Sequence, residues 1–138
     1  MLEVRAEKTA TPIKSFTDLI AWQAVYNLSL NVYKVTGSFP SSENFGLTSQ
    51  MRRASVSATS NIAEGFGRSG NKDRDHFYQM ASGSLYELKS QTLIAKGLGY
   101  LSQGDYEELV ELADRAHKLL NGLIRSHRAR NKLLISNV

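Results

Sequence analysis

The sequence predicts an all-α protein, a single-domain antiparallel up-down-up-down four-helix bundle. Apolar side chains recur at spacings of three and four residues along four long stretches, and short breaks rich in Gly, Ser and Pro separate these stretches. No segment alternates with a period of two, so we expect no sheet. The length of 138 residues suits one domain. We expect a flexible N-terminal arm over residues 1–15, the four-helix bundle over residues 16–128, and a basic to polar C-terminal tail over residues 129–138.

Capping residues bound the first two expected helices. The first helix runs from Asp18 to about Thr36, with Thr17 as its N-cap. The second helix begins at a cap on Ser41 or Ser42 and ends where glycines interrupt the chain. Its apolar seam is rich in small residues, and consists of Met51, Ala54, Ser55, Ala58 and Ile62.

The third and fourth expected helices are long and amphipathic. The third runs from about Lys72 to Leu98, and the fourth from a capping box at Ser102 and Asp105 through about Arg128. Long helices joined by short links favour an antiparallel bundle, because each helix needs neighbours that cover its apolar face. We expect the third helix to bury Phe77, Met80, Ala81, Ser84, Leu88, Ala95 and Leu98, and the fourth to bury Tyr106, Leu109, Ala113, Ala116, Leu120 and Leu123.

Composition excludes several classes of protein. The chain has no cysteine, which excludes a disulfide scaffold, a thiolate nucleophile and any zinc site that needs sulfur. The formal net charge is +4, and the segment from residue 125 to residue 138 contains four cations and no acid. The positive excess is therefore a terminal patch on an otherwise neutral chain. No apolar run has the length of a signal peptide or a membrane span, so we expect a cytoplasmic protein without membrane association.

Catalytic and cofactor motifs are weak. The segment from Gly65 to Gly70 matches the G-x-G-x-x-G dinucleotide fingerprint, but a helix precedes it where that motif requires a strand. We interpret its glycines as a helix C-cap and an interhelical turn, beside which Arg68 could bind a phosphate or a carboxylate. The serines of the second helix have no evident His and Asp partners. We expect no enzyme, cofactor, metal or small-molecule substrate, since the histidines are scattered at His76, His117 and His127.

A line of polar residues runs beside the small-residue seam of the second helix. One interpretation is a solvated face. The interpretation that we favour is a semi-buried polar network or a subunit contact, with the small residues Ala81 to Ser84 of the third helix as its partner. The line consists of Gln50, Arg53, Ser57, Asn61 and Glu64.

Basic residues gather at the end of the fourth helix. They could simply complement the negative end of the helix dipole. They could also contact phosphates, and an oligomer would present them several times over, which gives a salt-dependent affinity for nucleic acid. Aromatic side chains that stack on bases are missing from this segment, so binding would be directed at the backbone. The candidate nucleic-acid-binding residues are Arg52, Arg53, Arg68, Arg125, Arg128, Arg130 and Lys132.

Several short motifs occur in order over about residues 15–125. They are Phe16 to Gln23, Phe39-Pro40 with Glu43 to Leu47, Gln50 to Ala54, Ser60 to Gly65 with Gly67-Arg68, and Gly83 to Glu87. In these motifs the sequence resembles the bacterial four-helix-bundle family of 23S rRNA-intervening sequence proteins. It is also similar to the accessory proteins of diversity-generating retroelements, which form five-membered rings and bind nucleic acid. The pattern differs at Ser55 to Thr59, where the sequence has additional hydroxyls.

The resemblance implies a helical bundle, a ring-shaped homo-oligomer with five members, and binding of RNA or DNA. It supplies no catalytic residues. The leading hypothesis is therefore a non-enzymatic homo-oligomer that binds nucleic acid through basic patches. The alternative is a structural scaffold or protein-partner-binding module without affinity for nucleic acid.

Overall fold

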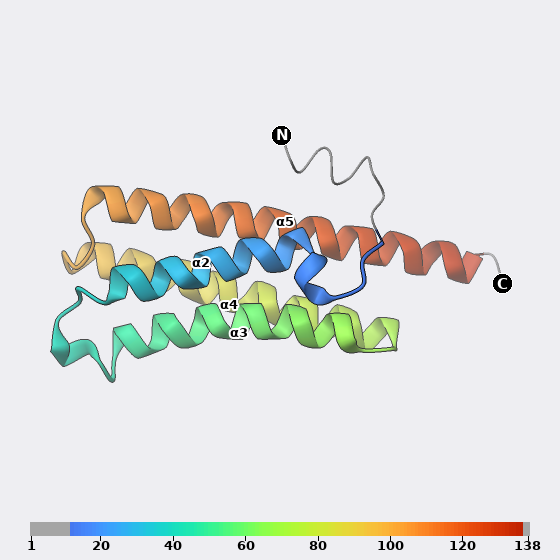
Figure 1. Ribbon diagram of the computed structural model, residues 1–138, viewed down its shortest axis with the longest axis horizontal. Helices are drawn as coiled ribbons and strands as arrows, with labels where there is room; N and C mark the ends of the chain where they lie inside the picture. The colour runs from blue at the N-terminus through green and yellow to red at the C-terminus, as the bar shows by residue number, and fades with distance from the viewer. Residues whose placement is uncertain (1–11, 137–138) are drawn as a thin grey trace.

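The structure, a computed structural model, describes residues 12–136, and within them it is all-helical. Figure 1 shows four α-helices side by side, with each helix running opposite to the one before it. Contacts join α2 to α3, α3 to α4, α4 to α5, and α5 back to α2. The predicted all-α, single-domain four-helix bundle is confirmed. In order, the elements are η1 (Phe16–Asp18), α2 (Ile20–Thr36), η2 (Ser41–Glu43), α3 (Leu47–Gly67), α4 (Asn71–Gly97) and α5 (Gln103–Ser136).

Helix α5 is longer than the sequence analysis predicts. It continues to Ser136, over residues 129–136 for which we expect a tail, and in Figure 1 it projects beyond the ends of α3 and α4. The reason is local, because this stretch contains no glycine or proline and several good helix formers. The predicted arm falls mainly on residues 1–11, which lie outside the described residues.

Two of the predicted helix starts are wrong. Helix α2 begins at Ile20, and its N-cap Leu19 makes no side-chain bond. Thr17 lies in the separate turn η1, which Ser15 caps by accepting the Thr17 N–H. Helix α3 starts at Leu47, because Ser41–Glu43 forms a separate short turn and Glu43 Oε1 accepts the Leu47 N–H at 3.0 Å. The predicted cap of α5 is confirmed, since Ser102 Oγ accepts the Asp105 N–H at 3.1 Å.

The core confirms the predicted seam of α3 and corrects that of α4. Every residue of the α3 seam is fully buried. Ala81, Leu88 and Ala95 of the predicted line are buried, but Met80 on α4 and Leu98 just after it are exposed. Tyr78 and Leu85 are buried in addition, because α4 turns this side toward α3 and α5. The buried line of α4 consists of Tyr78, Ala81, Leu85, Leu88, Thr92 and Ala95.

Of the additional hydroxyls at Ser55 to Thr59, that of Thr59 joins α3 to α2. Ser29 Oγ lies 3.0 Å from Thr59 Oγ1 and 3.1 Å from the Ser55 backbone carbonyl oxygen. The Ser55 hydroxyl bonds within α3, to the Arg52 carbonyl oxygen at 2.9 Å, so each of these polar groups has a partner, as buried polar groups require.

The G-x-G-x-x-G segment forms the end of α3 and the turn to α4, and this turn is as predicted, but the C-cap is Arg68 and not a glycine. Gly65 lies inside α3 against the Tyr78 ring, and the chain reverses before Asn71. The Arg74 side chain donates hydrogen bonds to the carbonyl oxygens of Gly65 at 3.1 Å and Arg68 at 2.8 Å. This arginine therefore satisfies the carbonyls that a helix leaves unpaired at its end.

We expect Gly65→Ala to destabilise the protein, because the added Cβ would lie 2.7 Å from a carbon of the buried Tyr78 ring. Overpacking of this kind costs about 1–3 kcal/mol. Gly83→Ala is the matched control, since its Cβ meets no atom within 4 Å and should stabilise α4 by about 0.5–1 kcal/mol. Urea unfolding measures both, and equal stabilities of the two variants would contradict the close approach at Gly65.

Candidate nucleic-acid interface

Three of the seven candidate cations have carboxylate partners. Arg128 forms two hydrogen bonds to the Asp75 carboxylate, at 2.7 and 3.1 Å, and this guanidinium lowers the pKa of Asp75. Arg68 pairs with Glu64 at 3.0 Å, and lies 3.8 Å from an oxygen of Asp73. Its charge is thus compensated at the position where the sequence suggests an anion site.

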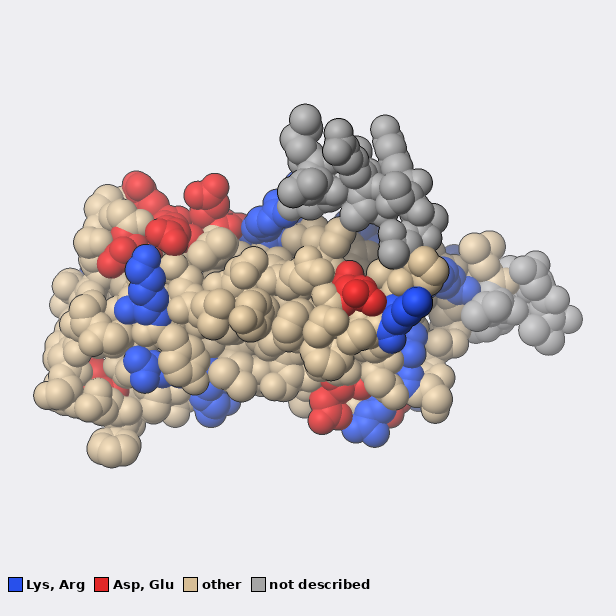
Figure 2. Space-filling model, viewed as in Figure 1, with Lys and Arg blue, Asp and Glu red and all other residues tan. Residues whose placement is uncertain are grey.

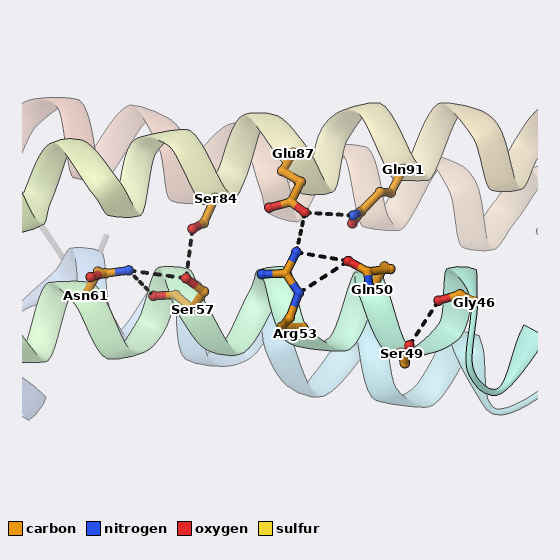
Figure 3. A network of polar contacts seen from close by, with 9 residues as sticks. All are labelled: Gly46, Ser49, Gln50, Arg53, Ser57, Asn61, Ser84, Glu87 and Gln91. Atoms are coloured by element: carbon orange, nitrogen blue, oxygen red, sulfur yellow. Dashed lines mark hydrogen bonds and ion pairs between the residues drawn. The ribbon is translucent and has the colours of Figure 1, made fainter.

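Arg53 belongs to a polar network between α3 and α4 (Figure 3). Its guanidinium forms an ion pair with Glu87 and also donates to Gln50 Oε1 at 2.9 Å. Farther along, Ser57 Oγ lies 2.9 Å from Ser84 Oγ. Both partners of the ion pair are more than one-third exposed, so the pair contributes at most about 1 kcal/mol.

The predicted polar line is therefore divided. The structure joins Gln50 to Arg53 in one group and Ser57 to Asn61 in another, with Asn61 Nδ2 donating to the Ser57 carbonyl at 2.9 Å. Glu64 is bound instead to Arg68. Glu87 is a member of the network that the sequence analysis missed, because it lies 34 positions away from Arg53.

Three cations near the end of α5 remain without a carboxylate partner within the part of the chain that the structure describes. They are Arg125, Arg130 and Lys132, and all three are exposed. Figure 2 shows acidic side chains gathered over the first half of α5 and basic side chains toward its other end. The basic helix end is thus an accessible surface for anions.

Arg52 has no carboxylate partner among the described residues, but other contacts hold its side chain in place. Its Nε donates to Thr36 Oγ1 at 3.0 Å, and the guanidinium carbon lies 4.7 Å from the centre of the Tyr33 ring. Its positive charge is therefore held in one position, facing a cleft between α2 and α3.

A buried histidine lies between α4 and α5, in a cluster that the sequence analysis missed. His117 Nε2 lies 2.9 Å from Ser82 Oγ, and Nδ1 lies 2.8 Å from Lys89 Nζ. An ammonium group can only donate, so Nδ1 is the acceptor and Nε2 carries the proton. The imidazole therefore cannot take a proton from Ser82, and the pair does not form a hydrolytic dyad.

Groups that hold metals are not found among residues 12–133. No cluster of three or more His, Asp or Glu side chains occurs there that could bind an ion. His127, like His117, has a partner, because its Nε2 lies 3.1 Å from the Asn71 carbonyl oxygen. None of the described helices is both long enough and apolar enough to cross a membrane.

Sequence and structure comparisons agree with this architecture. The family model described as 23S rRNA-intervening sequence protein matches residues 17–122. The chain belongs to this family. The fold of this family member is similar to the crystal structure of a protein with unknown function from the S23 ribosomal protein family of Bacteroides thetaiotaomicron, with a TM-score of 0.68 and 18% identity over 76% of this chain and 98% of that chain. No curated protein matches the sequence.

We expect His117 to make the protein less stable as the pH falls below about 6.5. Burial, and then the charge of Lys89, lower the pKa of His117 below its ordinary value of 6.5. As the pH falls below 6.5, the unfolded chain takes up a proton that the folded protein resists, and the contribution is lost toward the folded pKa. Thermal unfolding of His117→Gln should show a smaller loss over this range, whereas the exposed-site control His76→Gln should behave as wild type. Identical pH profiles for all three proteins would contradict this assignment.

Proposed function

We propose that this protein is a non-enzymatic homo-oligomer of the cytoplasm that binds RNA or DNA through the basic end of α5. The observation that carries this proposal is the separation of the cations into two sets. Arg53, Arg68 and Arg128 are compensated by carboxylates, whereas Arg125, Arg130 and Lys132 are exposed and unpaired in the described part of the chain.

The geometry favours contact with phosphates over reading of bases. Arg125 and Lys132 lie seven positions apart, so they share one face of α5 and are separated by roughly 10 Å along its axis. Arg130 lies on another side of the helix, so the charges surround the helix end. Such an arrangement suits salt-dependent attraction to a nucleic-acid backbone, and copies in one assembly would multiply it.

Neutralising the unpaired cations should weaken binding more than neutralising the paired ones. We expect the triple variant Arg125→Gln, Arg130→Gln, Lys132→Gln to lower the slope of log K against log salt by about 0.7–0.9 for each lost phosphate contact. The control, Arg68→Gln, Lys89→Gln, Arg128→Gln, removes the same net charge from cations that pair with carboxylates. Titration of labelled RNA and DNA at several salt concentrations compares them. Equal losses in the two variants, or no binding by wild type at low salt, would exclude the basic end as the site.

Two exposed apolar patches support the proposed homo-oligomer. The α2 patch consists of Tyr26 and Leu30, and the α4 patch of Tyr86, Leu93, Ile94 and Leu98, with each side chain at least 43% exposed. Helices α2 and α4 both contact α3 and α5, so they occupy opposite corners of the bundle. Contact between the α2 patch of one copy and the α4 patch of the next is head-to-tail, and such contacts form a ring when the rotation between copies closes. A five-membered ring remains an expectation from the family resemblance.

We expect Leu30→Glu and Leu93→Glu each to give monomers, because every head-to-tail contact needs one intact patch of each kind. An equimolar mixture should form dimers, since Leu30→Glu keeps its α4 patch and Leu93→Glu keeps its α2 patch. Light scattering measures the three masses. If the mixture stays monomeric while each variant alone is folded, the patches do not pair head-to-tail. A monomeric wild type would remove the oligomer from the proposal.

Phe45 favours a second candidate function, a scaffold that binds a protein partner. This side chain is 99% exposed between η2 and α3, and it lies within reach of no core residue that would cover it. Protruding aromatic residues are common anchors of protein interfaces. The scaffold function predicts no binding of RNA or DNA at any salt concentration, so the same titration separates the two functions.

A further inference from the structure

A cleft between the end of α2 and the beginning of α3 has the composition of an anion site. Its volume is about 580 Å³, within the range of ligand-binding pockets. Arg52 and Arg53 line it, and its lining contains no carboxylate. Glu43, at the end of η2, uses Oε1 to accept the Leu47 N–H and Oε2 to accept the Tyr100 hydroxyl. Glu87 of α4 compensates Arg53, so the uncompensated positive charge of the cleft is that of Arg52.

Hydrogen bonds hold both arginines in place and leave some of their guanidinium N–H groups available to donate to a ligand. Arg52 uses Nε on Thr36, and its guanidinium is stacked on Tyr33. Arg53 uses Nε and Nη2 on Gln50 and Glu87, and its Nη1 has no partner in the described part of the chain. Fixed guanidinium groups lose little conformational freedom on binding, which favours recognition of phosphate oxygens.

A buried hydroxyl provides an independent indication of a ligand. Thr48 lines the cleft and is 4% exposed, yet its Oγ1 has no hydrogen-bond partner. Leaving a buried hydroxyl unsatisfied costs about 1–3 kcal/mol. Thr48 also lies in the first turn of α3, where Glu43 Oε1 caps the Leu47 amide and the N-cap Gly46 has no side chain that could accept the amides that follow. An oxygen-rich anion could use both kinds of donor.

We propose that this cleft binds a nucleoside phosphate. The phosphate lies at Arg52, Arg53 and the first turn of α3. The base lies against the apolar wall that Tyr33 and Val56 provide, which a small inorganic anion would leave unused. The site is separate from the basic end of α5, so it does not depend on the proposed function. The nucleotide could be free or could be one residue of a flexible single strand, and both present the same chemistry.

Calorimetric titration of the full-length protein tests this site. The probes are adenosine monophosphate, uridine monophosphate, adenosine, inorganic phosphate and a single-stranded trinucleotide. We expect the two monophosphates to bind at least tenfold more tightly than adenosine or inorganic phosphate, because only they use both parts of the cleft. Tighter binding of the trinucleotide would assign the site to a strand, and equal or weaker binding would assign it to free nucleotides.

Variants separate recognition from structural effects. Arg52→Gln should weaken monophosphate binding at least tenfold, and Arg52→Lys should recover part of the loss. Thr48→Val should weaken binding severalfold while the melting temperature stays or rises, since the substitution removes an unsatisfied hydroxyl. Lys118→Gln, which removes an exposed cation of α5 outside the basic end, is the control and should leave monophosphate affinity unchanged.

Three results would overturn the proposal. The first is no heat of binding for either monophosphate at millimolar concentration. The second is equal affinity for adenosine and its monophosphate, which would show that phosphate is not recognised. The third is an unchanged affinity in folded Arg52→Gln and Thr48→Val. If these variants change the assembly of the protein and not its affinity, the cleft is a contact between copies.

Discussion

The close packing of α3 against α4 is the constraint on which much of this structure depends. Small residues at the contact, among them Ala58 and Ala81, are fully buried, and at Gly65 the helix backbone meets the Tyr78 ring directly. Residues larger than these would separate the two helices. Their proximity places Ser57 opposite Ser84 and Arg53 opposite Glu87, and it lets Arg74 reach the end of α3. The polar network is thus a product of the packing.

The same packing decides which charges are available to ligands. Cations along the contacts of α4 with α3 and α5 face carboxylates and serve to join helices. At the edge of the bundle, such a partner is missing, within the described residues, from Arg52 in the cleft between α2 and α3 and from the exposed cations of the basic end of α5. A small positive net charge can therefore produce two distinct anion surfaces, because the compensated charges contribute little to either.

Local signals made the helices, the α3 seam, the turn at Gly65 to Gly70 and the Ser102 cap predictable from the sequence. Each depends on residues a few positions apart. The contacts that the sequence analysis missed join distant residues: Ser82 and Lys89 lie 35 and 28 positions from His117. Periodicity shows that a helix has an apolar face. Which positions at the edges of that face are buried depends on the neighbouring helices, and α4 is the example. Candidate cations could be named from the sequence, whereas their partners required the fold.

The projecting end of α5 has an evolutionary consequence. Once a helix is nucleated, adding residues to it is easy, so the turns beyond Arg128 extend a helix that the bundle already holds. In that extension Ala129, Arg130, Lys132 and Leu133 are exposed, and substitutions there leave the core unchanged. Mutation can thus alter the charge of this segment at little risk to folding, and descendants of one bundle could acquire different binding preferences while keeping the same interior.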